Sequence, residues 1–208
     1  MKNILILFST IFMYSFVSKK EIAMVPQVNT VLYADVIFLG KITKVDSLGF
    51  YASVNEEVVN ETSDKNLFKT KQIFVSHSLY PENVGRYNYT HTPVKNTQFI
   101  FTLKQDEKTK KIVAFYYSFG IAVLENQDNK CYVNSSQKQE LLEPKKVIEG
   151  IKKLKKCVAN SQNLWNQEIF KFKVTDTELS IIKESNSATK LWIEEIESRN
   201  NYYKKLKN

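Results

Sequence analysis

The stretch that decides the fold is YADVIFLGKITKV, which runs from Tyr33 to Val45. It opens with a continuous apolar run, Val36–Leu39, and then Ile42 and Val45 stand on either side of the polar pair Thr43 and Lys44. A segment of β-branched and aromatic residues in which apolar residues become less frequent along the chain predicts a strand that is buried at one end and half-exposed at the other. Gly40 lies inside the run, which is typical of a bulge or a sharp bend such as a barrel corner. We expect the domain to be built around this strand.

Further strand-like segments follow the first one at intervals of roughly 10 to 20 residues. A turn at 46–49 makes the first two strands a hairpin, and a charged turn occupies 106–110. This spacing favours a small barrel or sandwich over repeated βαβ units. The expected strands are residues 50–59, 71–77, 97–103, 111–117, 121–124 and 131–133.

Two helices are expected after the strands. Pro144 stands at a position that the first turn of a helix tolerates, and apolar residues recur at helical spacing up to Val158 while lysines occupy the other face. A second apolar stripe with spacings of three and four residues predicts a helix over 188–206. The lysine face of 145–156 is expected to be solvated, with an anionic membrane or partner as the alternative.

Two flanking segments have weaker patterns. Residues 21–30 are expected to be an irregular lead-in, because Pro26 would block a helix there. Residues 169–174 alternate strictly and are expected to form a short strand.

These patterns together predict an α+β protein with a small antiparallel OB-like β-barrel or sandwich followed by C-terminal helices. The expected organisation is a signal peptide at 1–20, a β-barrel-like domain at 21–138, and a helical extension at 139–208 that packs on or beside the barrel.

The segment Ala34–Ile42 resembles the first strand of netrin-like domains, the OB-type barrels that include the tissue inhibitors of metalloproteinases. In that family an Ala-Asp pair leads an apolar strand that carries a small and a basic residue, and a hairpin follows. The resemblance implies a barrel topology, and a fold does not by itself give a function. Those inhibitors present an N-terminal cysteine to zinc, whereas this chain has no cysteine before Cys131. Inhibition by that route is not expected.

The start of the chain has the pattern of a secretory signal. Lys2 is followed by a mostly apolar run, Ile4–Val17, which is shorter than the roughly 20 residues of a membrane span. The sequence therefore predicts a secreted or periplasmic protein, with an uncleaved anchor and a buried core segment as the alternatives. The 30 basic and 22 acidic residues give a net charge of +8, which favours anionic partners. Export argues against nucleic acid as the partner.

The two cysteines, Cys131 and Cys157, permit one disulfide in an exported chain. Such a bond would close a loop of about 25 residues and would contribute roughly 3 kcal/mol to stability. The alternative is a pair of reduced, buried thiols that behave as small hydrophobic groups.

A polar and aromatic segment supplies the candidate ligand-binding residues, which are Arg86, Tyr87, Tyr89 and His91. In an extended chain the two tyrosines and the histidine fall on one face, and tyrosine and arginine suit recognition surfaces. The alternative is a half-buried edge strand whose tyrosines cover the core.

No motif for catalysis, for a metal or for a cofactor stands out. The chain has two histidines and no cysteine or histidine pair at zinc-ligand spacing, and it has no nucleophile elbow or phosphate-binding glycine loop. We therefore expect no catalytic residues, no metal and no cofactor. The sequence predicts an exported, non-catalytic binding module of a bacterial envelope, with a protein or an anionic surface as its partner. The alternative is an envelope hydrolase that uses His77 and His91.

Overall fold

Strand β1 (Val36–Val45) is the strand that the apolar run predicts, and both of its faces are buried where it begins. Val36 and Phe38 point into one hydrophobic core, and Ile37 points into a second one on the opposite side. Farther along, Thr43 is half-buried and Val45 is exposed. Successive side chains of a strand point to opposite faces, so a solid apolar run is what a strand between two cores requires.

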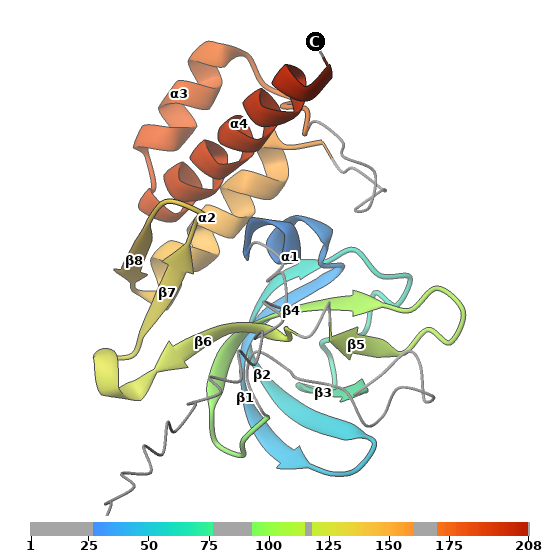
Figure 1. Ribbon diagram of the computed structural model, residues 1–208. Coiled ribbons are helices and arrows are strands. Elements are labelled where there is room, and N and C mark those ends of the chain that lie inside the picture. Colours follow the sequence, from blue (N-terminus) through green and yellow to red (C-terminus); the bar gives the residue numbers. More distant parts are fainter. Residues whose placement is uncertain (1–26, 77–92, 115–117, 160–169, 208) are drawn as a thin grey trace, which may run out of the picture.

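The computed structural model describes residues 27–76, 93–114, 118–159 and 170–207 (Figure 1). Five strands close into a barrel in the order β1-β2-β3-β5-β4, and β4 pairs with β1. Every seam is antiparallel except that between β3 and β5, which is parallel. This confirms the predicted α+β class with an OB-like barrel. The other barrel strands are β2 (Gly49–Asn60), β3 (Gln72–Ser76), β4 (Gln98–Gln105) and β5 (Ile112–Ala114).

Phenylalanine rings fill the interior of the barrel. Phe38 stacks on Phe101 with ring centroids 4.7 Å apart, and Phe99 meets Phe119 edge-on at 4.8 Å. Side chains in contact at these distances form a packed interior, as is typical of small barrels. The buried phenylalanines of this core are Phe38, Phe50, Phe68, Phe99, Phe101 and Phe119.

Gly40 marks a bulge, as its place in the sequence predicts. The register between β1 and β2 shifts between Leu39 and Gly40. A Cβ atom on Gly40 would lie 1.9 Å from the carbonyl oxygen of Ser53 on β2. The close approach of the two strands therefore requires glycine at this position.

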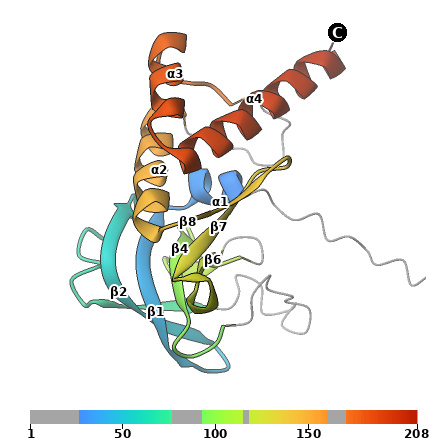
Figure 2. The same ribbon diagram turned by 90° about the vertical axis from the view of Figure 1, so that its left-hand side faces the viewer.

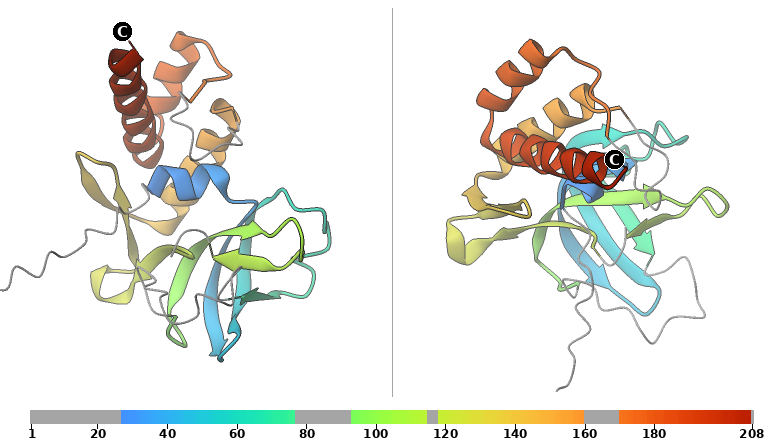
Figure 3. Two further views of the ribbon diagram at one scale, coloured as in Figure 1. Left: turned by 45° about the vertical axis from the view of Figure 1, so that its right-hand side comes forward. Right: turned by 45° about the horizontal axis from the view of Figure 1, so that its top comes forward.

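The sheet continues out of the barrel from β4. β6 (Gly120–Leu124) leads through a short 3-10 turn (Glu125–Gln127) to the hairpin of β7 (Lys130–Asn134) and β8 (Gln139–Leu142). The predicted boundary at 138 falls between these two strands. The helices α2 (Pro144–Cys157), α3 (Asp176–Glu184) and α4 (Ser187–Lys207) follow, and they lie together at one end of the barrel (Figures 1 and 3).

A short helix, α1 (Gln27–Tyr33), lies between the barrel and the helical layer (Figure 1). Its Gln27 accepts a hydrogen bond from the indole of Trp192 on α4 at 3.2 Å and donates one to the carbonyl of Tyr132 on β7 at 3.0 Å. The second core surrounds α1 and joins Ile37 of β1 to the fully buried Trp192. The helical layer is therefore packed on the barrel and shares a core with it.

Two predictions for the flanking segments were wrong. The first was an irregular lead-in at 21–30, of which the structure describes residues 27–30; these belong to α1, because Val28 and its helical neighbours pack into the second core. The second was a strand at 169–174, where the described part forms only a single bridge between Phe172 and Val158. The sequence patterns also missed β8 and α3, although Thr175 starts α3 with a complete capping box.

The helix predicted from Pro144 and the one predicted over 188–206 are confirmed as α2 and α4. Within the part of the chain that the structure describes, no helix has both the length and the hydropathy needed to cross a membrane.

Candidate functional site

The outer surface of β1, β2 and β3 carries a mixed aromatic and basic face. Tyr51 on β2 lies between Lys44 on β1 and Phe74 on β3 in the strand register. The next row places Ser53 between Lys41 and Gln72. Phe50, Ala52, Ile73 and Val75 alternate with these residues and point the other way, into the phenylalanine core of the barrel. Thr43 and Lys44 share the outer face because the β1–β2 register shifts between Ile42 and Lys44. We call this surface the Tyr51 face; its residues are Lys41, Thr43, Lys44, Tyr51, Ser53, Gln72 and Phe74.

The centre of the Tyr51 face is a pair of aromatic rings. The rings of Tyr51 and Phe74 are 4.9 Å apart at an interplanar angle of 51°, and the ammonium group of Lys44 lies 5.5 Å from the centre of the Tyr51 ring. The Phe74 ring also lies over Gly49, where a Cβ atom would come within 2.7 Å of it. Both aromatic residues are half-buried, and neither belongs to either hydrophobic core. They form a supported aromatic surface on the outside of the barrel.

Polar side chains hold the frame of this face in place. The amide of Gln72 donates to the hydroxyl of Thr43 at 3.0 Å, and that hydroxyl donates to the carbonyl of Tyr51 at 3.2 Å. On the next row, the backbone N–H of Lys41 donates to the hydroxyl of Ser53 at 3.3 Å. The side chains around the rings are therefore ordered by contacts with one another and with the strands.

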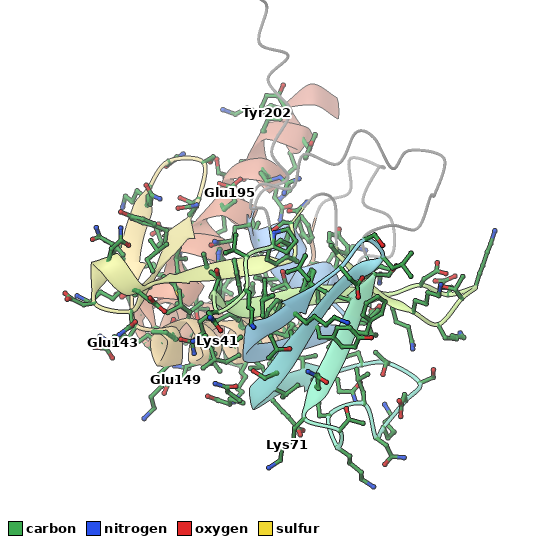
Figure 4. The ribbon with its side chains drawn as sticks, turned by 90° about the horizontal axis from the view of Figure 1, so that it is seen from below. Lys41, Lys71, Glu143, Glu149, Glu195 and Tyr202 are labelled. Carbon is green, nitrogen blue, oxygen red and sulfur yellow. The ribbon has the colours of Figure 1, made fainter. Side chains whose placement is uncertain are left out.

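Positive charge borders the same face. Lys41 lies on β1, and Lys71 is exposed just before β3 (Figure 4). Lys44 is 4.0 Å from Asp46, whose other carboxylate oxygen accepts the backbone N–H groups of Leu48 and Gly49 and so caps the β1–β2 turn. At the tip of this turn Leu48 is 73% exposed. The face thus combines aromatic, apolar and cationic groups.

The helical layer leaves this part of the barrel uncovered. Figure 2 shows α1 and the C-terminal helices over one end of β1 and β2, while the turn that joins these strands lies at the opposite end. The Tyr51 face lies toward that turn, since Lys44 and Tyr51 are a few residues from it on either side.

A second polar cluster joins α2 to the barrel. The ammonium group of Lys155 donates to the carbonyl of Ala34 at 2.7 Å and pairs with Glu61 at 2.9 Å. Its side chain is only 7% exposed, and this burial lowers the pKa of Lys155, although Glu61 and Asp35 oppose the shift. Asp35 in turn pairs with Lys104 at 3.0 Å. These contacts join α2 to the start of β1, to the end of β2 and to β4, so we assign the cluster a structural role.

The lysine face of α2 is solvated for the most part, as predicted, and Lys155 is the clearest exception. Lys155 is buried in that joint, and Lys152 pairs with Glu56 of β2 at 3.6 Å. Lys145 and Lys156 are exposed, as expected for a solvated face.

The candidate ligand-binding residues Arg86, Tyr87, Tyr89 and His91 lie outside the described residues, and so does His77 of the alternative hydrolase site. Their roles stay predictions. Among the described residues no cluster of histidine, cysteine and acidic side chains could hold a metal ion.

The proposed disulfide between Cys131 and Cys157 is not formed. Both cysteines are free and buried. Cys131 lies opposite Leu142, just before α2 begins, and Cys157 ends that helix about 20 Å farther along its axis. Burial raises the pKa of Cys131 to about 12 and that of Cys157 to about 11, so both thiols are protonated at neutral pH.

The Tyr51 face was not among the sites predicted from the sequence, although the pattern of β2 contained a signal for it. Phe50 and Ala52 alternate with Tyr51 and Ser53, and this alternation predicts that Tyr51 and Ser53 lie together on the face opposite to Phe50 and Ala52. The partner ring Phe74 could not be assigned to the same face, because the register of β2 and β3 depends on where the 60–71 loop lets the strands meet.

Comparison of this chain with models of protein families, with curated proteins and with solved structures found no match. The resemblance of Ala34–Ile42 to netrin-like domains stays a prediction.

Proposed function

We propose that the chain is an exported, non-catalytic binding module that takes up its partner on the Tyr51 face. The observation that carries this proposal is the Tyr51–Phe74 ring pair, which is supported from below by Gly49 and lies outside both hydrophobic cores. Aromatic side chains with few rotatable bonds provide large contact area at low entropic cost. A ring pair of this kind suits recognition more than it suits packing.

The closed barrel restricts how a partner can bind. β2 is paired with β1 and β3, and β1 is paired with β2 and β4, so these strands offer no edge to an added strand. Contacts on this side of the barrel must therefore come from side chains. The aromatic, hydroxyl, amide and ammonium groups of the Tyr51 face are the groups available there.

Binding to a panel of immobilised polysaccharides and peptides tests the site. The comparison is between the unchanged protein and the double variant Tyr51→Ser, Phe74→Ser, with the pair Tyr202→Ser, Tyr203→Ser on α4 as the matched control. Tyr202 and Tyr203 also form a ring pair, at 5.6 Å, and Tyr202 is 60% exposed. We expect the unchanged protein to bind at least one member of the panel. The Tyr51→Ser, Phe74→Ser variant should lose this binding, and the Tyr202→Ser, Tyr203→Ser control should keep it. Binding that is equal in all three proteins would overturn the proposed site.

Export is tested separately. The full chain with a C-terminal tag should be recovered outside the cytoplasm, with an N-terminus that begins after the apolar run Ile4–Val17. Recovery of the tagged chain in the cytoplasm, with Met1 in place, would overturn this part of the proposal.

A hydrolytic activity on any member of the panel that one point substitution abolishes would contradict the non-catalytic assignment.

A further inference from the structure

We infer that the Tyr51 face binds an acidic oligosaccharide, with one sugar ring over Tyr51 and Phe74 and an acidic group beside Lys41 or Lys44. This inference rests on the proposed function and names its ligand class. Three properties of the face support it: the shape of the ring pair, the kind of polar groups around it, and the sign of its charge.

The shape of the ring pair suits a single sugar ring. Its two rings are tilted by 51° and their centroids are 4.9 Å apart, so they form a bent surface rather than a flat row. A strand of nucleic acid needs a succession of aromatic rings on which neighbouring bases stack. A single sugar ring can lie against a bent pair with its C–H groups toward the rings, and OB-type barrels bind oligosaccharides as well as oligonucleotides.

The surrounding polar groups match sugar hydroxyls. A sugar hydroxyl both donates and accepts hydrogen bonds, and so does the amide of Gln72. The hydroxyls of Thr43 and Ser53 already donate their protons to the carbonyls of Tyr51 and Lys41, so toward a sugar they act only as acceptors. Gln72 uses one N–H in its bond to Thr43, which leaves its other amide proton and its carbonyl oxygen on an exposed side chain. The frame is held before a ligand arrives, which lowers the entropic cost of binding.

The charge of the face selects an acidic ligand. Among the described residues, Lys41 forms no ion pair with a carboxylate, and neither does Lys71 beside the face. Lys44 is 67% exposed, and its ammonium group lies 4.0 Å from Asp46. These ammonium groups therefore keep most of their charge available to a partner. A carboxylate or sulfate beside the sugar ring would be attracted to them.

Titration calorimetry with defined probes tests the inference. The acidic probes are an oligogalacturonate and a sulfated oligosaccharide; the neutral probe is the methyl ester of the oligogalacturonate, and the rival probe is an oligothymidylate. We expect at least one acidic sugar to bind at least about tenfold more tightly than the ester, which corresponds to about 1.4 kcal/mol. The affinity should fall when the ionic strength rises from about 0.01 M to about 0.15 M, because the screening length shortens from ~30 Å to ~8 Å.

Variants locate the binding. Tyr51→Ser should weaken binding of the acidic sugar at least about tenfold, since tyrosine is among the residues whose truncation at the centre of an interface costs the most affinity. Lys41→Gln with Lys44→Gln should weaken it and flatten its salt dependence. Lys145→Gln, an exposed lysine on α2, is the matched control and should leave the affinity unchanged. Unfolding midpoints of all variants show whether a loss of binding is a loss of fold.

Each remaining outcome decides against the inference in its own way. Equal binding of the ester and the acidic sugar through Tyr51 would refute the role of charge but keep the site of the proposed function. If oligothymidylate bound more tightly than the acidic sugars, the inference would be refuted and nucleic acid would be the ligand class. The inference would be overturned if no sugar probe bound, or if Tyr51→Ser left the binding unchanged. The proposed function would be overturned only if the wider panel of polysaccharides and peptides also gave no binding that depends on the Tyr51 face.

Discussion

The substitution Gly40→Ala tests the strand around which the barrel closes. The backbone of Gly40 has no positive φ, so alanine is conformationally allowed there. The new Cβ atom would nevertheless lie 1.9 Å from the carbonyl oxygen of Ser53 and 2.8 Å from the Phe38 ring. Since real Cβ contacts are longer than 3.0 Å, β1 and β2 would have to separate by more than 1 Å.

The cost of this separation can be worked out from the bonds at risk. Lys41 and Ser53 exchange two hydrogen bonds of 3.3 Å next to Gly40, and each is worth about 0.5 to 1.5 kcal/mol. Overpacking adds about 1 to 3 kcal/mol, and the gain of replacing a strand glycine offsets about 0.5 to 1 kcal/mol. We expect the free energy of unfolding to fall by about 3 kcal/mol.

Urea and thermal denaturation measure this change. With an m-value near 2 kcal/mol/M the urea midpoint should fall by about 1.5 M, and the Tm should fall by roughly 6 to 12 °C. Ser47→Ala in the exposed β1–β2 turn is the control and should stay within about 0.5 kcal/mol of the unchanged protein. If Gly40→Ala were as stable as that control, the close approach of β1 to β2 would be refuted.

Three other predictions concern buried ionisable groups. Lys155→Met should lower the free energy of unfolding by about 1 to 2 kcal/mol through loss of charged hydrogen bonds, including the bond to Glu61, while Lys156→Met at the exposed neighbour stays within about 0.5 kcal/mol; equal urea midpoints would contradict this. Cys131 and Cys157 should react with a thiol reagent only after denaturation, and a native protein that gives two fast thiols would contradict their burial. Because folding raises both thiol pKa values from 9.0 to about 12 and about 11, their contribution to stability is complete below pH 9 and is lost as the pH rises toward 11 and 12, which urea midpoints across that range would show.

The sequence predicted the barrel strand correctly because its hydrophobic pattern matches the way its side chains pack. The run Val36–Leu39 is apolar on both faces because one face fills the barrel and the other meets the helices, and Gly40 follows directly from the approach of β2. The helices α2 and α4 were also readable, because each presents a continuous apolar stripe to one core.

Other elements depend on contacts that no local pattern records. α1 has only seven residues, too few to be stable alone, and it is held by Gln27 and by the core around it. Whether Cys131 and Cys157 form a disulfide depends on the distance between them, which the sequence does not give. The length of α2 separates the two residues by more than a disulfide can span. The Tyr51 face needed the β2–β3 register, which sets Phe74 beside Tyr51.

Nuclear magnetic resonance of the labelled protein tests the binding face most directly. Titration with the tightest-binding acidic sugar should shift the backbone amides of 41–44, 49–53 and 72–76 together, at one common affinity, and leave those of α2 and α4 in place. Shifts confined to the helical layer, or scattered over the lysines without the amides of Tyr51 and Phe74, would contradict the account.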